Sequence, residues 1–184
     1  MRVCLIAALA LTSSIRAGQV MDACEQKLPP SLRQSLAAKF PGFRPAGVHD
    51  QDRDATKAEK KAGRDGCLTV AQGDFDGAGI QDVALLLTKT GRPKAGSVLL
   101  VAALHRAGAW DPYRLPTFCA EARSCYVQTE KPGVFNRSEA LDGPLSGPYE
   151  RERLESRTDS ILPGTLESTG IVHVFSKGEW VYVW

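Results

Sequence analysis

The sequence has little of what common zinc and cysteine-nucleophile sites require. Its 184 residues include three histidines and five cysteines, and no two cysteines stand in a Cys-x-x-Cys pair. A zinc site is therefore disfavoured, because such sites gather Cys and His at close spacing. A single catalytic cysteine with a histidine partner is disfavoured too, since the cysteines can pair among themselves.

Internal repeats and an excess of charge of one sign are also missing. No segment recurs at a fixed period, so a propeller or solenoid is not expected. Lys and Arg number 23 and Asp and Glu 21, which leaves no basic excess for nucleic acid. The densest charge run, residues 50–65, mixes both signs without aromatics and predicts a solvated loop or frayed helix. The composition, 43% hydrophobic and 24% charged, fits one globular domain.

The apolar run at the N-terminus, from Met1 to Leu11, is too short to span a bilayer. It follows a basic start and ends in Thr12, which is typical of a secretory signal peptide. We expect a signal peptide over residues 1–17, with cleavage at Ala17 or as late as Ala23, and one α+β domain over residues 24–184. Its removal takes away two basic residues and leaves a formally neutral chain without a transmembrane segment. The expected location is periplasmic or secreted.

Four cysteines remain after the signal: Cys24, Cys67, Cys119 and Cys125. An even number in an exported chain predicts two disulfides, for which three pairings exist. Local spacing favours Cys119 with Cys125, which leaves Cys24 with Cys67. Acylation of Cys24 as a lipoprotein is the minor alternative, because Asp22 puts a charge where such signals carry small apolar residues.

Apolar periodicity predicts one helix and several strands. Leu32, Leu36 and Phe40 recur at i, i+4 and i+8 in a helix over residues 31–40. The predicted strands cover residues 67–71, 83–88, 97–104, 110–115, 171–176 and 179–184, with a short one near residues 134–135. We therefore expect a single antiparallel sheet of about five to seven strands, a meander plus a C-terminal hairpin, with the one N-terminal helix packed on it.

The C-terminal hairpin has the clearest pattern, because Lys177 and Gly178 supply a two-residue turn. This register puts Phe175 opposite Trp180 and His173 opposite Tyr182. One face of the hairpin then carries the aromatic ladder His173, Phe175, Trp180, Tyr182 and Trp184. Burial in the core is one interpretation of this ladder, and a surface for a protein partner or ligand is the other.

A glycine-rich turn with three aspartates joins two predicted strands. It reads Gly73-Asp74-Phe75-Asp76-Gly77-Ala78-Gly79-Ile80-Gln81-Asp82. Short carboxylates at alternate positions can converge on one hard cation, and glycines allow the tight fold that this needs. A metal-free turn is the alternative, since Asp and Gly also suit turns in which carboxylates accept backbone N–H groups.

The turn resembles the calcium-binding loop of FG-GAP or VCBS-type repeats, over about a dozen residues and once in the chain. The resemblance implies that Asp74, Asp76 and Asp82 are side-chain ligands and that Ile80 offers its backbone carbonyl. Ala78 stands where the pattern has a third carboxylate, so we expect either no cofactor or weakly bound calcium. The chain as a whole is similar to small exported bacterial proteins that carry one such loop and have no assigned activity.

Two classes of function remain. The first is a non-catalytic exported binding protein, such as an inhibitor or immunity-type protein that binds a protein partner. The second is a periplasmic hydrolase using carboxylates such as Glu150, Glu152 and Glu155, although these alternate with arginines and suggest a solvated element. The sequence favours the first class.

Overall fold

The computed structural model describes residues 21–91, 97–139, 144–166, 168 and 170–184. The predicted signal peptide over residues 1–17 lies outside these residues. The helical elements are α1 (Ala23–Gln26), α2 (Pro30–Lys39), η1 (Val48–Asp50), α3 (Arg53–Lys61) and η2 (Ala122–Ser124). The strands are β1 (Phe43–Pro45), β2 (Val70–Gly73), β3 (Asp82–Lys89), β4 (Val98–Arg106), β5 (Ala109–Leu115), β6 (Cys125–Glu130), β7 (Gly133–Asn136), β8 (Arg153–Ser156), β9 (Ser160–Thr165), β10 (Val172–Ser176) and β11 (Glu179–Val183).

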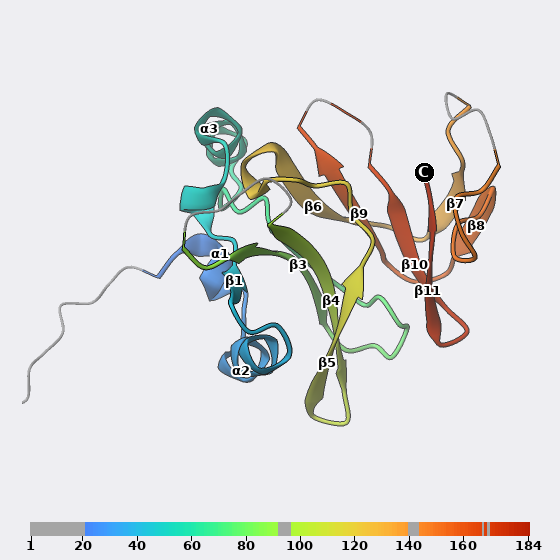
Figure 1. The fold of residues 1–184 in the computed structure, drawn as a ribbon, viewed down its shortest axis with the longest axis horizontal. Coiled ribbons are helices and arrows are strands. Elements are labelled where there is room, and N and C mark those ends of the chain that lie inside the picture. Colours follow the sequence, from blue (N-terminus) through green and yellow to red (C-terminus); the bar gives the residue numbers. More distant parts are fainter. Residues whose placement is uncertain (1–20, 92–96, 140–143, 167, 169) are drawn as a thin grey trace, which may run out of the picture.

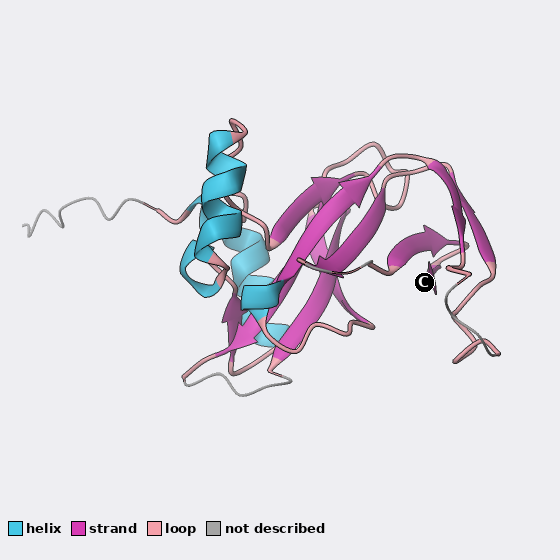
Figure 2. Ribbon diagram, turned by 90° about the horizontal axis from the view of Figure 1, so that it is seen from above, coloured by secondary structure: helices cyan, strands magenta, loops and turns pink. Residues whose placement is uncertain are grey.

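The described strands form three antiparallel sheets. The first has the order β1-β3-β4-β5, with β2 also paired to β3, and the second has the order β11-β10-β9-β6. Strands β7 and β8 pair with each other as the third. Figure 1 shows the helices on one side of the first sheet, the second sheet on its other side, and β7 and β8 beyond that. Figure 2 shows the helical side and the strands from above.

Strand β3 explains this layering, because its residues are buried on both faces. Leu86 belongs to the cluster between the first and second sheets, whereas Leu85 and Leu87 pack with Leu32 of α2. A strand covered on both sides needs a continuous apolar run rather than alternation, which is what residues 83–87 provide. A third, smaller cluster lies between the C-terminal hairpin and the β7–β8 pair.

The α+β class is confirmed, but the expectation of one sheet with one helix is wrong. The structure has three sheets, and α1 and α3 accompany α2 among the described residues. Part of the charged segment 50–65 folds as α3, because Asp52 accepts the N–H groups of Asp54 and Ala55 at its N-terminus. Strands β1, β6, β8 and β9 were not predicted.

The C-terminal hairpin is confirmed in its register. Phe175 lies opposite Trp180, and His173 lies opposite Tyr182. Lys177 and Gly178 both have positive φ, at 53° and 87°, as a two-residue hairpin turn requires.

The cysteine pairing is confirmed as well. Cys24 is bonded to Cys67, with 5.1 Å between their Cα atoms, and Cys119 to Cys125, with 6.0 Å. The first bond attaches α1 to the chain that leads into β2, and the second closes the loop before β6. Within the described part of the chain, no helix has both the length and the apolar character needed to cross a membrane.

Candidate functional site

The turn between β2 and β3 brings the three predicted aspartates together. One carboxylate oxygen each of Asp74, Asp76 and Asp82 lies within 4.8 Å of the other two. Gly77 and Gly79 make this curvature accessible, since their φ angles of 77° and 73° lie in the left-handed region. The convergence expected from the sequence is therefore present.

Backbone and arginine donors already occupy five of the six oxygens. Asp82 is 1% exposed and accepts the N–H groups of Phe75 and His105 at 3.0 and 2.8 Å. Asp76 accepts Ala78 N–H at 3.0 Å and the Nε of Arg106 at 2.7 Å.

Asp74 accepts Gly79 N–H with Oδ2 at 3.0 Å, while its Oδ1 is buried and has no hydrogen-bond partner. A carboxylate oxygen that accepts one N–H still has a second acceptor position. The three side chains can therefore still ligate a cation, but they also satisfy the turn without one.

The pKa values of Asp82 and Arg106 are both raised, but for different reasons. Desolvation raises the pKa of Asp82 above its usual range, because the carboxylate is removed from water. The pKa of Arg106 is raised by its hydrogen bond to Asp76, whose side chain is 6% exposed. A positive charge thus lies against the cluster already, and a divalent cation would compete with it.

Ile80 is 43% exposed on the same turn. Its role as a backbone ligand stays a prediction, and so does the FG-GAP or VCBS resemblance.

The turn also connects the first and second sheets through hydrogen bonds. Asp74 donates its N–H to Asp159 Oδ2 and accepts the Asp159 N–H with its carbonyl, both at 3.2 Å. Thr158 donates its hydroxyl to the Phe75 carbonyl at 3.1 Å. Thr158 and Asp159 lie just before β9, so these bonds attach the β2–β3 turn to the second sheet.

The sequence analysis missed three participants, Arg106, Thr158 and Asp159. The register of β3 against β4 gives a signal for Arg106. Val83 lies opposite Ala103, so the end of β4 lies beside the turn. Thr158 and Asp159 lie more than 75 residues away from the turn in the sequence, and no local pattern connects their segment to it.

A groove runs between the edge strands of the two large sheets. It encloses about 370 Å³ and is lined mainly by apolar surface. The lining residues are Tyr113, Arg114, Leu115 and Pro116 from β5 and the chain after it, Tyr149, and Gly178, Glu179, Trp180 and Tyr182 from the C-terminal hairpin. Pockets of this size and character commonly bind ligands.

The predicted aromatic partner surface is only partly formed. Trp180 and Tyr182 line the groove, whereas His173 is 1% exposed and therefore cannot belong to an exposed surface. Phe175 packs against the core between the sheets, and Trp184 stacks on Phe118 with ring centroids 5.3 Å apart. The aromatic ladder thus combines core packing with a groove wall.

His173 is buried as a neutral imidazole. Desolvation lowers its pKa to about 3, an effect that a hydrogen bond with the Pro116 backbone opposes. Its Nε2 has no hydrogen-bond partner. A histidine that cannot be protonated near neutral pH and is shielded from solvent contributes to packing rather than to acid–base chemistry.

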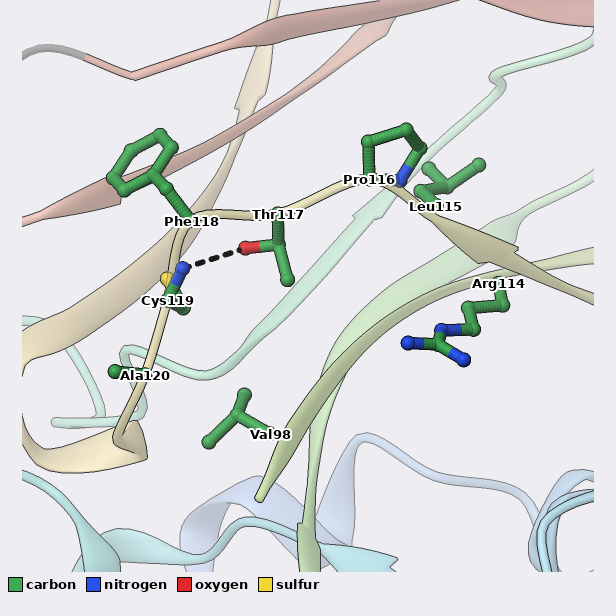
Figure 3. Close-up of a pocket in the computed structure, with 8 residues that line it drawn as sticks. All are labelled: Val98, Arg114, Leu115, Pro116, Thr117, Phe118, Cys119 and Ala120. Carbon is green, nitrogen blue, oxygen red and sulfur yellow. Dashed lines mark hydrogen bonds between the residues drawn. The ribbon is translucent and has the colours of Figure 1, made fainter. Parts of the chain in front are cut away.

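A second cavity, of about 640 Å³, is lined by Val98 and by the chain from Arg114 to Ala120. Figure 3 shows this segment running from Arg114 to Ala120. The Thr117 hydroxyl accepts the Cys119 N–H at 3.1 Å. Arg114, Leu115 and Pro116 line both cavities. The two cavities therefore share one short segment in their lining.

The glutamates of the hydrolase alternative do not form an acid–base pair. Glu150 is 1% exposed, accepts Arg137 Nε at 3.1 Å and Ser146 N–H at 2.5 Å, and also accepts the Ser146 hydroxyl. The Ser146 hydroxyl and N–H and the Arg137 guanidinium lower its pKa, the reverse of what a general acid needs. Glu152 and Glu155 are exposed to solvent.

Comparisons with known proteins give no match for this chain, whether with protein-family models, curated proteins or solved structures. The geometry alone therefore supports the functional argument that follows.

Proposed function

We propose that the chain is an exported, non-catalytic binding protein whose ligand site is the groove between β5 and the C-terminal hairpin. The observation that carries this is the groove itself, with aromatic walls supplied by Tyr113, Tyr149, Trp180 and Tyr182. Tyr149 is 50% exposed there. Tyr and Trp are the side chains that most often anchor binding interfaces.

Export is supported by the two disulfides, which persist in oxidising compartments. Within the proposal, Ala17 is the better of the two signal cleavage sites. Asp22 accepts Cys24 N–H and Val48 N–H, both at 2.8 Å, and cleavage at Ala23 would remove both contacts.

Capture from periplasmic extract tests the proposal. The immobilised protein is expected to retain one protein at a stoichiometric amount, and Tyr149→Ala to lose it. Val134→Ala on β7 is the matched control, because Val134 is similarly exposed at 47% but lies outside the groove. Retention of the same protein by the wild type and both variants would show that the groove is not the site. A bound small substrate without any protein partner would favour the hydrolase alternative.

A second proposal is that calcium binds weakly at Asp74, Asp76 and Asp82. It is supported by their convergence and by the buried Asp74 Oδ1 that lacks a partner. Weak binding is expected because the turn lacks a carboxylate at Ala78 and Arg106 already pairs with Asp76. Extracellular calcium modules commonly bind in the range of about 10⁻⁴ to 10⁻³ M.

Thermal unfolding tests this second proposal. At that affinity, about 10 mM calcium should stabilise the fold by about 1 to 3 kcal/mol. Asp76→Asn should abolish the rise in melting temperature, while Arg106→Gln should enlarge it by removing the competing charge. If millimolar calcium leaves the wild-type melting curve unchanged, the aspartates serve only the turn.

A further inference from the structure

We infer that the cavity beside Arg114 binds a small amphipathic monoanion, a molecule with one carboxylate on an apolar body. This inference goes beyond the proposed binding function, because it concerns the cavity of about 640 Å³ rather than the groove. Its first support is charge: of the eight described residues that line this cavity, Arg114 alone is charged. Cavities of such volume commonly accommodate small organic ligands.

The guanidinium of Arg114 is available to a ligand. Arg114 is exposed, and within the part of the chain that the structure describes its side chain has neither an acid partner nor a hydrogen bond. Figure 3 shows this side chain extending from β5 toward the space between Thr117 and Val98. Glu179 lines the neighbouring groove but not the cavity, so an anion is attracted more strongly to the cavity than to the groove.

The rest of the lining selects a single charge on an apolar body. Its apolar residues include Val98, Leu115 and Phe118, and Thr117 adds one hydroxyl. A multiply charged anion such as phosphate would leave most of its oxygens unpaired against one guanidinium and one hydroxyl. An uncharged apolar molecule would cover the guanidinium of Arg114 without pairing it. A monoanion on an apolar body matches both kinds of surface.

The segment that forms most of the cavity wall is held in place by the rest of the fold. The Pro116 carbonyl accepts a hydrogen bond from the buried His173 imidazole. Phe118 stacks on Trp184 with ring centroids 5.3 Å apart, and Cys119 belongs to a disulfide. Because three residues of the segment are fixed in this way, ligand binding orders little of the chain, which lowers the entropic cost of association.

Nuclear magnetic resonance of the full chain at pH 7 tests the inference, with decanoate below its micelle-forming concentration as the probe. Decanoate should shift the backbone amide signals of Thr117, Phe118 and Ala120 saturably. Decanol, which has the same alkyl chain without the charge, should bind about fivefold more weakly, the difference that one exposed ion pair provides. Arg114→Gln should lower the affinity for decanoate to that for decanol and leave the affinity for decanol within about twofold.

Three further variants locate the ligand. Glu179→Gln is the matched control, because it removes an exposed charge that lines the groove and not the cavity, and it should change the decanoate affinity by less than about twofold. Tyr149→Ala, also in the groove, should leave decanoate binding unchanged. Ala120→Phe should weaken decanoate and decanol alike, because Ala120 is exposed on the cavity wall and a larger side chain there fills the space.

Several outcomes would overturn the inference: no saturable shift in the segment, equal affinity for decanoate and decanol, or unchanged decanoate affinity in Arg114→Gln. Inorganic phosphate that binds as tightly as decanoate would also overturn it, because the cavity would then be a site for polar anions. Decanoate binding that Tyr149→Ala weakens as much as Arg114→Gln would locate the anion in the groove instead. If decanoate fails while Tyr149→Ala still loses the captured periplasmic protein, the binding function stands and the inference about the cavity is wrong.

Discussion

Protonation of the buried His173 should make the fold sensitive to mild acid. Its pKa in the folded chain is lowered to about 3 from an ordinary value of 6.5, chiefly by desolvation. The unfolded chain therefore binds the proton first, so protonation favours unfolding. The stability tied to the neutral imidazole is fully present above pH 6.5 and is lost as pH falls toward 3.

The magnitude follows from the two pKa values. Each pH unit between them changes the free energy of unfolding by about 1.4 kcal/mol, so a shift from pH 7 to pH 5 should remove about 2 kcal/mol. The pKa of Asp50 is lowered, so protonation of this carboxylate changes the free energy of unfolding mostly below pH 5. The pKa of Asp82 is raised, so its protonation stabilises the folded chain as pH falls. This contribution is the same in the wild type and in every variant compared, because all of them keep Asp82.

Urea unfolding at pH 7, 6 and 5 measures the effect. His173→Asn and His173→Phe should each lose about 2 kcal/mol less than the wild type over this range, whatever their stability at pH 7. Equal pH dependence in the wild type and both His173 variants would refute the reasoning.

Two further predictions concern the turn and the disulfides. Gly77→Ala should destabilise the fold more than Gly79→Ala, since both need positive φ but only a Cβ at Gly77 would approach Thr158 Cγ2, at 2.9 Å. The difference, measured by urea unfolding, should shrink when Thr158→Ser removes that methyl group, and equal costs would contradict the contact. Replacing the Cys24–Cys67 pair by serines should cost about 4 kcal/mol and the Cys119–Cys125 pair about 2 kcal/mol, because the closed loops span 43 and 6 residues. Thermal unfolding of the two double variants checks this order, and a larger loss for the shorter loop would contradict it.

Local patterns predicted the elements that depend on neighbouring residues. The C-terminal hairpin needs only a two-residue turn and alternating side chains, so its register followed from the sequence. The β3–β4–β5 meander was predicted for the same reason, since consecutive antiparallel strands pair through short connections. The convergence of Asp74, Asp76 and Asp82 followed from glycine positions within one turn.

Long-range partners could not be predicted in this way. Strand β9 contains Pro163 and Gly164, which weaken a strand pattern, yet it pairs with β6 and β10 in the centre of the second sheet. The sequence also did not show that the aromatic ladder would be covered over only part of its face. This partial coverage depends on how β5 and the C-terminal hairpin pack across the two sheets. The sequence therefore could not show whether His173 is buried.

Arg106 connects the aspartate turn to the groove through a short series of contacts. It pairs with Asp76, its guanidinium carbon lies 4.8 Å from the centroid of the Phe175 ring, and that ring packs edge-on against Trp180 at 5.2 Å. A cation that displaces the guanidinium from Asp76 must therefore change what Phe175 contacts, and Phe175 supports the groove wall. Calcium should then shift the Trp180 indole N–H signal of the wild type but leave that of Trp110 in place. Arg106→Gln should bind calcium without shifting Trp180, whereas an equal Trp180 shift in this variant would show that the turn affects the groove by another route.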